Sequence, residues 1–426
     1  MKKVGVAILG LGTVGGGVFR ILTEKKEFLK RTQNLDVTIE SVLTRTKEKA
    51  AAMGADESII ASNIEEVVSN PAVDIVAESI GGIEPARTYV LKALMSGKTV
   101  VTSNKELLAK CWSELEEEAK KMNAGLFFEA SCVGGVPIIR VLEESMQGDE
   151  ITSFKGIING TTNYILTKMA SEGSSYEAAL KEAQKLGYAE ANPSSDVEGF
   201  DAAYKLSILA SLAFKTKISY NDIYREGITD VKKEDIAYGK AMGYALKLLA
   251  IGKNGKDGID VRVHPAFVKA CDPLASVNDS FNAVRLVGDA AGDIMLYGRG
   301  AGALPTGSAV VSDIVFAAKH ADYYYSCFKN DEKGNKETEF VSDYVSEYYL
   351  RLSVKDEAGV MAKIAGAFAK SGISLKEVKQ NPAEDGKAEI IVTTHGCKET
   401  CMRKNLEKIN SIEEVFGVES CIRIEE

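Results

Sequence analysis

An acidic and a basic residue lie one helical turn apart in the stretch GFDAAYKLSILASLAF, residues 199–214. Asp201 and Lys205 are four residues apart, so on a helix they share one face. That face continues through the apolar residues Ile208, Leu209 and Leu212. The spacing leaves two interpretations open: an ion pair at the edge of the core, or the wall of a polar cavity in which a lysine transfers protons.

Three further stretches place polar side chains where an α/β protein binds small molecules. VVTSNKE, residues 100–106, puts Ser103, Asn104 and Lys105 after an expected strand, and open α/β sheets bind ligands at the carboxyl ends of their strands. FFEASCVGGVP, residues 127–137, puts Glu129 at another strand end. GYAEANPSSDVEGFDAAYK gathers four acids before Lys205, namely Glu190, Asp196, Glu198 and Asp201. Each acid alone is typical of a solvated surface, but their convergence with the lysine indicates a polar site.

The cysteines leave two other kinds of site open. Cys132 could be the nucleophile of an aldehyde dehydrogenase, which needs an activating base. The chain has three histidines and none is near Cys132 in sequence, so we expect a small residue that fills a glycine-rich turn. A zinc site in the C-terminal part is the second alternative, although Cys-x3-Cys spacing is loose for zinc. Its ligands would be His395, Cys397, Cys401 and Cys421.

Hydrophobic runs separated by helix-length segments predict an α/β fold in the first half of the chain. This alternation is typical of a doubly wound parallel sheet of the Rossmann type. The first strand is followed directly by a glycine-rich turn and a helical pattern that extends to about residue 29. The expected strands lie at residues 4–9, 37–43, 73–77, 98–102 and 126–129.

The glycine-rich turn has the spacing of a dinucleotide-binding site. Gly10 permits the tight turn, Gly12 lets the backbone approach a pyrophosphate, and Gly15 lets the helix pack closely on the strand. The helix then begins at Thr13 and Val14, whose free N–H groups can bind phosphate. The alternative is a plain strand–turn–helix in which the glycines serve packing only.

The end of the second strand bears on which nicotinamide cofactor is bound. NAD sites place an acidic residue there, but this strand ends in Thr44 and Arg45, and Glu40 falls in mid-strand. An arginine suits the 2′-phosphate of NADP. We therefore expect NADP(H) to be preferred over NAD(H), unless Arg45 is simply a solvated loop residue.

The composition narrows the class of protein. The 426 residues are too many for one ordinary core, and a net charge of −9 without a basic block argues against a nucleic-acid partner. No apolar run approaches the ~20 residues that span a bilayer, and the N-terminus lacks a signal-peptide cleavage site. Seven scattered cysteines, an odd number, do not form a disulfide framework. We expect a cytoplasmic protein with reduced thiols and no membrane partner.

The sequence predicts that the C-terminal part is a separate domain. KNDEKGNKETE, residues 329–339, has no apolar residue and predicts a linker or an exposed hairpin. The elements that follow have the order β-α-β-β-α-β of a ferredoxin-like fold. Its strands are expected at residues 348–354, 373–379, 388–394 and 418–424, with the second helix at 398–410.

Six motifs in a fixed order resemble the homoserine dehydrogenase family over about the first 325 residues. They are GLGTVGGGV, TSNKELLA, EASCVGGVPII, GIINGTTNYIL, LGYAEANPSSDVEGFDAAYKLSILA and GRGAGALPTGSAVVSDI. The shorter motifs DEAGV and GISL resemble an ACT domain, a small-molecule sensor of amino-acid enzymes. The resemblance implies an enzyme that reduces L-aspartate 4-semialdehyde to L-homoserine with NAD(P)H, on the route to threonine, methionine and isoleucine.

Roles of single residues follow from the resemblance. Lys205 matches the catalytic acid/base and Lys105 the lysine that assists near the nicotinamide, while Glu190, Asp201 and Gly187 match residues that hold the substrate. Hydride delivery builds negative charge on the aldehyde oxygen, and a partly desolvated lysine can stabilise and protonate it. The polar-cavity interpretation of the 199–214 helix is therefore favoured.

The resemblance also implies contacts to a cation and to the cofactor. Glu129 and backbone oxygens of Cys132, Gly134 and Val136 match a monovalent-cation site, usually sodium. The family commonly has valine where this chain has Cys132, which backbone coordination tolerates. The expected cofactor contacts beyond the glycine-rich turn are Ser103, Lys105 and Gly302.

The resemblance gives an outline of the domains and partners. A Rossmann domain is expected at 1–130, returning at about 305–328, then a catalytic and dimerisation α+β domain at 131–304, a linker at 329–347 and a ferredoxin-like ACT domain at 348–426. The ACT domain is expected to pair with another copy, in a dimer or tetramer, and to bind L-threonine near Asp356 and Gly359. A purely structural dimerisation domain, and a sensor without catalysis, are the alternatives.

Overall fold

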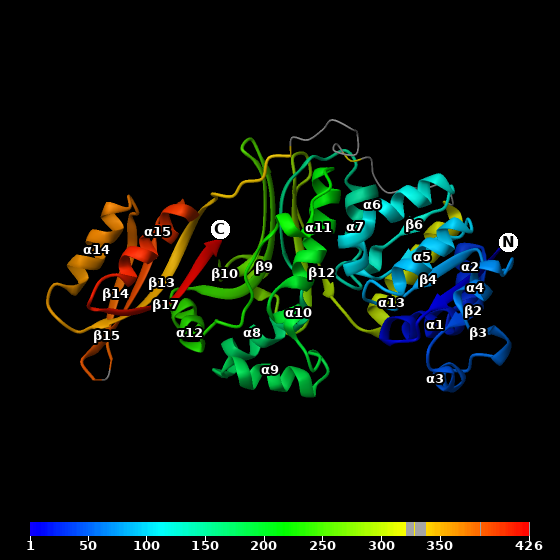
Figure 1. The fold of residues 1–426 in the computed structure, drawn as a ribbon, viewed down its shortest axis with the longest axis horizontal. Helices are drawn as coiled ribbons and strands as arrows, with labels where there is room; N and C mark the ends of the chain where they lie inside the picture. The colour runs from blue at the N-terminus through cyan, green and yellow to red at the C-terminus, as the bar shows by residue number, and fades with distance from the viewer. Residues whose placement is uncertain (321–327, 329–337, 384, 426) are drawn as a thin grey trace.

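The computed structural model describes residues 1–320, 328, 338–383 and 385–425. The molecule is elongated, with an N-terminal part, a central part and a C-terminal part in a row (Figure 1). Residues 329–337 of the predicted linker at 329–347 lie outside the described residues, whereas 338–347 are described. In the described part of the chain, no helix is long and apolar enough to cross a membrane.

The N-terminal part is a six-stranded parallel sheet with the strand order β3-β2-β1-β4-β5-β6. This is the order of a dinucleotide-binding Rossmann fold, so the predicted fold class is confirmed for this part. The sequence analysis missed β3, which has two residues and no hydrophobic run. The strands are β1 (Lys2–Leu9), β2 (Leu35–Leu43), β3 (Ile60–Ala61), β4 (Ile75–Glu78), β5 (Thr99–Thr102) and β6 (Leu126–Phe127).

The helix expected after the glycine-rich turn is two helices. The chain leaves the helical conformation at Lys25, with φ −105° and ψ 15°, and α2 then packs along β2 rather than continuing the line of α1. The helices of this part are α1 (Thr13–Glu24), α2 (Lys26–Gln33), α3 (Lys47–Ala52), α4 (Ile64–Ser69), α5 (Ala86–Met95) and α6 (Lys105–Lys121).

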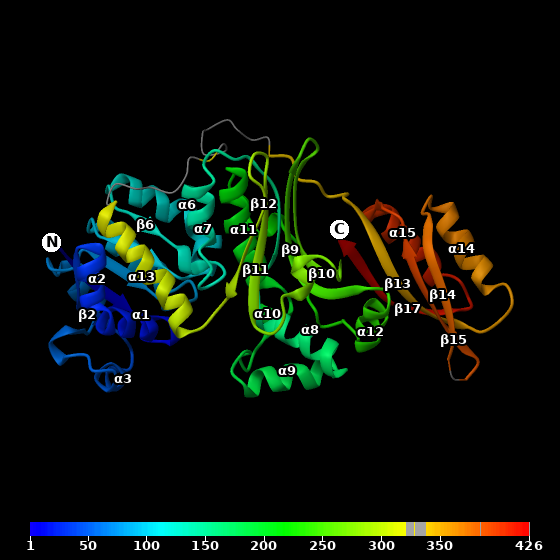
Figure 2. The same ribbon diagram turned by 180° about the vertical axis from the view of Figure 1, so that it is seen from behind.

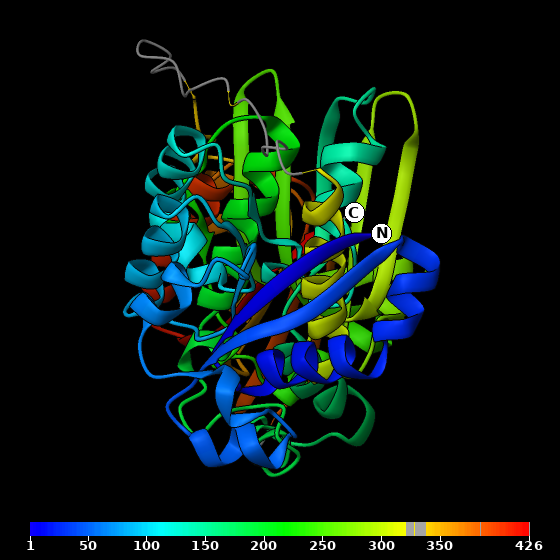
Figure 3. The same cartoon turned by 90° about the vertical axis from the view of Figure 1, so that its right-hand side faces the viewer.

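A helix from much later in the chain covers this sheet. α13 (Ala303–Lys319) packs against α1 and reaches β4 and β5, as seen from behind in Figure 2 and from the N-terminal end in Figure 3. The two helices touch through glycines: a Cβ atom on Gly17 would lie 1.9 Å from the carbonyl oxygen of Ala303, and one on Gly307 would lie 2.9 Å from Gly17. The backbones therefore meet with no room for a side chain.

The central part is built on an antiparallel sheet whose strands run β12-β11-β7-β9-β10. Helices α8, α11 and α12 pack against β9. The strands are β7 (Ile151–Ile157), β8 (Tyr224–Arg225), β9 (Tyr244–Gly255), β10 (Gly258–Lys269), β11 (Phe281–Gly288) and β12 (Gly292–Arg299). The helices are α7 (Ile138–Arg140), α8 (Gly160–Glu172), α9 (Tyr176–Lys185), α10 (Ser194–Val197), α11 (Phe200–Phe214) and α12 (Lys233–Ala241).

The C-terminal part has the predicted β-α-β-β-α-β order and its own hydrophobic core. It is not separate as expected, because β17 also pairs with β10 and the two sheets become one of eleven strands. The last strand therefore belongs to both parts (Figure 1). The elements are β13 (Val345–Lys355), α14 (Val360–Lys370), β14 (Leu375–Pro382), β15 (Lys387–Thr394), β16 (Cys397–Lys398), α15 (Glu399–Asn410) and β17 (Val415–Glu425).

The glycine contact between α1 and α13 can be tested with two neighbouring substitutions. Gly17→Ala forces a methyl group into the Ala303 carbonyl, and such overpacking costs about 1–3 kcal/mol. Gly16→Ala is the matched control, because its Cβ would meet only the flexible end of Met53 at 3.4 Å and helix propensity favours alanine by about 1 kcal/mol. Thermal unfolding should show a lower melting temperature for the first variant only. Equal melting temperatures would contradict the close packing.

Candidate active site

One buried carboxylate joins two lysines from different parts of the molecule. Asp201 lies in the first turn of α11, and its Oδ2 is 2.6 Å from Nζ of Lys205 on the same helix. Its Oδ1 is 3.2 Å from Nζ of Lys105, the first residue of α6, directly after β5. The side chain of Asp201 is 5% exposed, that of Lys205 12% and that of Lys105 41%. The predicted ion pair thus exists, and it also belongs to a polar site.

Asn159 fixes the orientation of this carboxylate and was missed by the sequence analysis. Its Nδ2 donates to Oδ2 of Asp201 at 2.8 Å and to Oδ1 of Asp196 at 2.7 Å. Its Oδ1 accepts from the N–H of Thr162 at 2.8 Å and so caps the N-terminus of α8. The signal was present in GIINGTTNYIL, where an asparagine before a helical segment predicts an N-cap.

Charge pairing governs the protonation of the cluster. Burial opposes ionisation of Asp201, but the ammonium groups of Lys205 and Lys105 outweigh it and hold the pKa of Asp201 below its usual value. Asp201 in turn raises the pKa of Lys105, against the effect of desolvation. Burial and the nearby charge of Asp201 raise the pKa of Asp196. Lys205 also donates to the carbonyl of Ile158 at 2.9 Å, so its ammonium points into the cluster.

The other two expected substrate residues lie on the loop after α9. Gly187 has a left-handed φ of +79°, and Glu190 is exposed. The loop is tied to the start of α8, because the hydroxyl of Thr161 donates to the carbonyl of Tyr188 at 2.6 Å. Within the described residues, no hydrogen bond or ion pair joins the Glu190 side chain to Asp201 or Lys205. The structure thus brings Asp201, Lys205 and Lys105 together, but not Glu190.

The glycine-rich turn lies at the carboxyl end of β1. Gly10 adopts a φ of +89°, and a Cβ on Gly15 would lie 1.9 Å from the carbonyl oxygen of Gly10, so both glycines are required by the backbone. A Cβ on Gly12 would meet nothing within 4 Å, which leaves that side open to a ligand. No side chain caps α1, so the N–H groups at Thr13 and Val14 are available to an anion. These residues fit the pyrophosphate of a dinucleotide.

The ends of β4 and β5 complete the edge of the sheet where the glycine-rich turn lies. Glu78 ends β4 and is fully buried, and its carboxylate accepts from Thr102 Oγ1 at 2.5 Å and from the N–H of Ile80 at 2.6 Å. Burial raises its pKa. The sequence analysis missed this residue, which holds the loops after both strands. Ser103 and Asn104 follow β5, and Asn104 caps α6.

The remaining residues expected to contact the cofactor lie on two loops. Gly302, with a φ of +122°, is the residue before α13, the helix that packs on α1. Arg45 follows β2 and is exposed. Both are therefore free to contact a ligand from the solvent side of the sheet edge.

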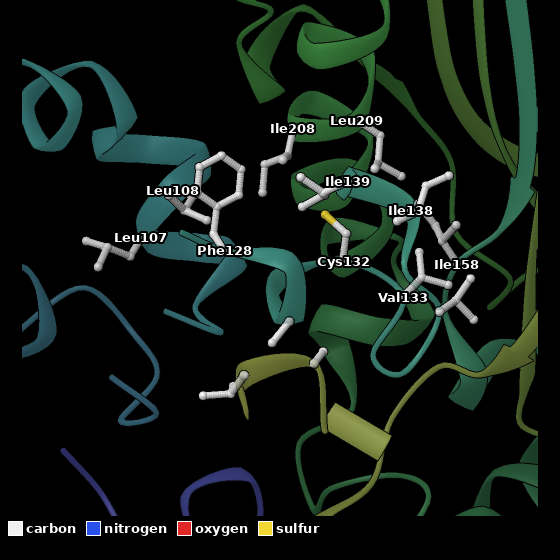
Figure 4. Close-up of a cluster of buried hydrophobic side chains, with 14 of the residues drawn as sticks. Leu107, Leu108, Phe128, Cys132, Val133, Ile138, Ile139, Ile158, Ile208 and Leu209 are labelled. Atoms are coloured by element: carbon white, nitrogen blue, oxygen red, sulfur yellow. The ribbon is translucent and has the colours of Figure 1, made fainter. Parts of the chain in front are cut away.

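Cys132 is part of the hydrophobic core beneath the site. Apolar side chains surround it, among them Val133, Ile138, Ile139, Ile208 and Leu209 (Figure 4). Burial raises the pKa of its thiol to about 12, so it holds no thiolate near neutral pH. The nucleophile alternative is therefore not supported by its environment.

Known proteins match this chain over its whole length. The sequence profile described as Homoserine dehydrogenase, NAD binding domain matches residues 10–129, that of Homoserine dehydrogenase 137–315, and that of the ACT domain 348–414. A homoserine dehydrogenase of Bacillus subtilis is 42% identical over 430 residues, which cover all of this chain and 99% of that protein. The chain belongs to the homoserine dehydrogenase family. It is thus an NAD(P)-dependent oxidoreductase.

Solved structures of the family have the same fold. A homoserine dehydrogenase of Thiobacillus denitrificans superposes with a TM-score of 0.93 at 38% identity, covering 100% of this chain and 99% of that one. A hyperthermophilic archaeal homoserine dehydrogenase in complex with NADPH has a TM-score of 0.64 at 31% identity and covers 74% of this chain and 98% of its own. The nicotinamide cofactor and the ACT domain expected from the sequence are confirmed.

The loop expected from the sequence to hold a cation starts two residues after β6. Glu129 begins a short 3₁₀ turn rather than ending the strand, because its carboxylate turns to the N-terminus of α7. Its two oxygens accept from the N–H groups of Ile139 at 2.9 Å and Arg140 at 2.8 Å. A cation here would therefore be held by backbone carbonyls. Val133 and Gly134 have left-handed φ values of +54° and +56°, which bend the loop sharply.

In the ACT part of the chain, the loop expected to bind a ligand is exposed to solvent. Asp356 and Gly359 are both exposed, and Gly359, with a φ of +94°, precedes α14. The carboxylate of Asp356 accepts from Nε2 of Gln380 at 3.1 Å. Elsewhere in the ACT part the zinc alternative is wrong, because no group of three or more His, Cys, Asp or Glu residues in the described part of the chain could hold a metal ion.

The buried environment of Cys132 predicts that turnover does not depend on its thiol. Cys132→Val, of similar volume, should keep most of the turnover, whereas loss of a true nucleophile costs several orders of magnitude. Iodoacetamide near neutral pH should alkylate the exposed Cys271 and leave the buried Cys132 unmodified, as read by peptide mass spectrometry. A large loss of turnover in the valine variant, together with rapid alkylation of Cys132, would restore the nucleophile hypothesis.

Proposed function

We propose that this chain catalyses the reversible, NAD(P)H-dependent reduction of L-aspartate 4-semialdehyde to L-homoserine in the cytoplasm, as a step in the synthesis of threonine, methionine and isoleucine. The observation that carries the proposal is the carboxylate of Asp201 between Nζ of Lys205 at 2.6 Å and Nζ of Lys105 at 3.2 Å. Lys105 follows β5 at the edge of the sheet where the glycine-rich turn lies, so the acid–base groups and the cofactor would meet.

The two lysines have different tasks in this proposal. Lys205 is the acid that protonates the developing alkoxide, and the base in the reverse direction. Lys105, at the cofactor side, stabilises the same oxygen. Desolvation strengthens both interactions, because charges attract more strongly where water is excluded. Asp201 keeps both ammonium groups oriented before the substrate arrives.

The acids would hold the amino-acid end of the substrate. Asp201 is buried and negatively charged, and the substrate's ammonium group can pair with it in place of Lys105. Glu190 is exposed, and no hydrogen bond or ion pair engages its side chain among the described residues, so together with Gly187 it can close over the substrate from the loop after α9. When the substrate's ammonium group pairs with Asp201, Lys105 would thus be released from this carboxylate and could move towards the reacting oxygen.

The cofactor proposed is NADP(H), preferred over NAD(H). When bound, it supplies or accepts the hydride. Gly10, Gly12, Thr13, Val14 and Gly15 would hold its pyrophosphate, as their geometry fits. Ser103 and Gly302 would contact it from the neighbouring loops, and the exposed Arg45 would bind the 2′-phosphate. The hyperthermophilic archaeal homoserine dehydrogenase in complex with NADPH supports NADP(H) as a cofactor by analogy.

A monovalent cation, sodium in the proposal, would be held in the loop after β6. Backbone oxygens of Glu129, Cys132, Gly134 and Val136 would hold it, since the Glu129 carboxylate is engaged with α7. Carbonyl oxygens are hard ligands that suit such an ion. Its role would be to fix the loop that packs under α11.

The ACT part is proposed to bind L-threonine at the loop of Asp356 and Gly359 and to reduce turnover by feedback. The exposed carboxylate and the free N-terminus of α14 can bind the two charged ends of an amino acid. We also propose a homo-oligomer, a dimer or tetramer, because β12 is an edge strand with the exposed side chains Met295 and Tyr297.

Spectrophotometric assay of NADPH oxidation with L-aspartate 4-semialdehyde tests the reaction. Lys205→Ala should lower kcat by about 10²–10⁴-fold while NADPH binding, followed by fluorescence, is kept. NADPH should be used better than NADH. Millimolar L-threonine should reduce the rate of the unmodified protein.

A lysine at the other end of α6 provides the matched control. Lys121 is 66% exposed and, in the described part of the chain, pairs only with Glu118 at 3.3 Å, so Lys121→Ala should leave kcat unchanged. If the unmodified protein binds NADPH but shows no turnover, the remaining interpretation is a sensor of cofactor and amino acid without catalysis. Normal turnover of Lys205→Ala would refute the mechanism, and a rate indifferent to threonine would refute only the regulatory part.

A further inference from the structure

A short segment of the central part, residues 224–228, lies between the ACT part and the helix that carries Asp201. It begins with β8, which pairs with β10 so that Arg225 lies opposite Val263. The N–H of Glu226 then donates to the carbonyl of Val263 at 2.8 Å. β10 pairs in turn with β17 of the ACT part. The 224–228 segment is therefore attached to the strand at which the two parts join.

Side chains of the segment bind the ACT part directly. Oε2 of Glu226 accepts from Nη1 of Arg423 at 2.7 Å and from the hydroxyl of Tyr224 at 3.0 Å. Nη2 of Arg423 donates to the same hydroxyl at 3.0 Å. The side chain of Arg423 is 5% exposed, and it also donates to both carboxylate oxygens of Glu399 on α15. A buried arginine of the last strand thus fixes the position of Glu226.

The backbone of the segment packs on the connection between α10 and α11. The N–H of Ile228 donates to the carbonyl of Val197 at 2.8 Å. A Cβ on Gly227 would collide with that carbonyl oxygen, so the two backbones are in direct contact. The guanidinium of Arg225 donates to the next carbonyl, that of Glu198. The segment therefore holds this connection by hydrogen bonds and by close packing.

Both buried acids of the site lie at the two ends of this connection. Asp196 is in α10 and Asp201 is in the first turn of α11, and Asn159 donates to both. Gly199 turns the chain between them with a left-handed φ of +82°. A shift of the connection would therefore move the carboxylate that the two lysines share. A misplacement of about 1 Å at a reacting group can cost about 10²-fold in rate.

We propose that Glu226 is a positioning residue of the active site, which ties the place of Asp201 to that of the ACT part through the 224–228 segment. The contacts are continuous from Arg423 of β17 through Glu226 to Val197, and so to the start of α11. A ligand that changes the position of the ACT part would act on the substrate site by this route. The kinetic consequence rests on the proposed reaction, but the link does not rest on threonine as the effector.

Hydrogen–deuterium exchange of the full-length protein, read by mass spectrometry, tests the link without turnover. Glu226→Gln keeps the size of the side chain and removes the charge that pairs with Arg423. The side chain of Glu226 is 41% exposed, so the fold should be kept. Amides in peptides that cover residues 197–205 should exchange about fivefold faster or more, as expected for the loss of a charged hydrogen bond.

Assays of NADPH oxidation give the kinetic consequence. In Glu226→Gln the KM for L-aspartate 4-semialdehyde should rise about fivefold or more, because Asp201 is proposed to hold the ammonium group of the substrate. The dissociation constant of NADPH should stay unchanged, since the glycine-rich turn lies in the Rossmann part. Glu226→Asp keeps the charge and should recover part of both the exchange rate and the KM.

Tyr238→Phe is the matched control at the same junction. The hydroxyl of Tyr238 on α12 donates to Oε2 of Glu389 on β15 at 2.8 Å, and it accepts from Nδ2 of Asn381 at 3.2 Å. It thus joins the central part to the ACT part without a hydrogen bond to the 224–228 segment among the described residues. This variant should leave the exchange at 197–205 and the KM unchanged.

Two results would overturn the proposal. One is that Glu226→Gln leaves the exchange at 197–205 or the KM as in the unmodified protein. The other is that Tyr238→Phe changes them as much, because the effect would then belong to the junction in general. If the unmodified protein shows no turnover, the proposed reaction fails, and the exchange result alone decides whether the link exists.

Discussion

The sharing of one buried carboxylate between two lysines is the constraint on which the rest of the structure depends. Asp201 is 5% exposed, so its charge is stable only while cations and hydrogen-bond donors surround it. Lys205 comes from the same helix, Lys105 from the edge of the Rossmann sheet, and Asn159 from the start of α8. Three separate segments must therefore meet at one carboxylate to within hydrogen-bond distance.

That requirement explains features of the fold that lie away from the site. The Rossmann part has to be held against the central part, and α13 does this by returning from the central sheet to pack on α1 through Gly17 and Gly307. Glu78 holds the loops after β4 and β5, which sets the start of α6 and so the position of Lys105. The core around Cys132 supports α11 from below. Each of these contacts fixes the position of a backbone segment, and none of them involves a group that takes part in the proposed reaction.

Much of this arrangement could be predicted from the sequence, and the rest could not for physical reasons. The parallel sheet, the glycine-rich turn, the 199–214 helix and the ferredoxin-like order follow from local periodicity and turn residues. Asn159 and Glu78 carry no local signal of burial, because the groups that they meet in the interior, Asp201 and Thr102, lie 42 and 24 residues away. The pairing of β17 with β10 joins segments about 150 residues apart, so the C-terminal part looked separate. Short elements such as β3 have too few residues to show a pattern.

The pH dependence of kcat/KM for the unmodified protein and for Asp201→Asn tests the central claim most directly. The asparagine keeps the shape and the hydrogen bond from Asn159 but removes the charge that raises the pKa of Lys105. The alkaline limb of the profile should therefore move to lower pH, because a lysine without its carboxylate loses its proton more easily. An alkaline limb that stays in place in the variant would contradict the account, since the shared carboxylate would then have no influence on the groups that carry the proton.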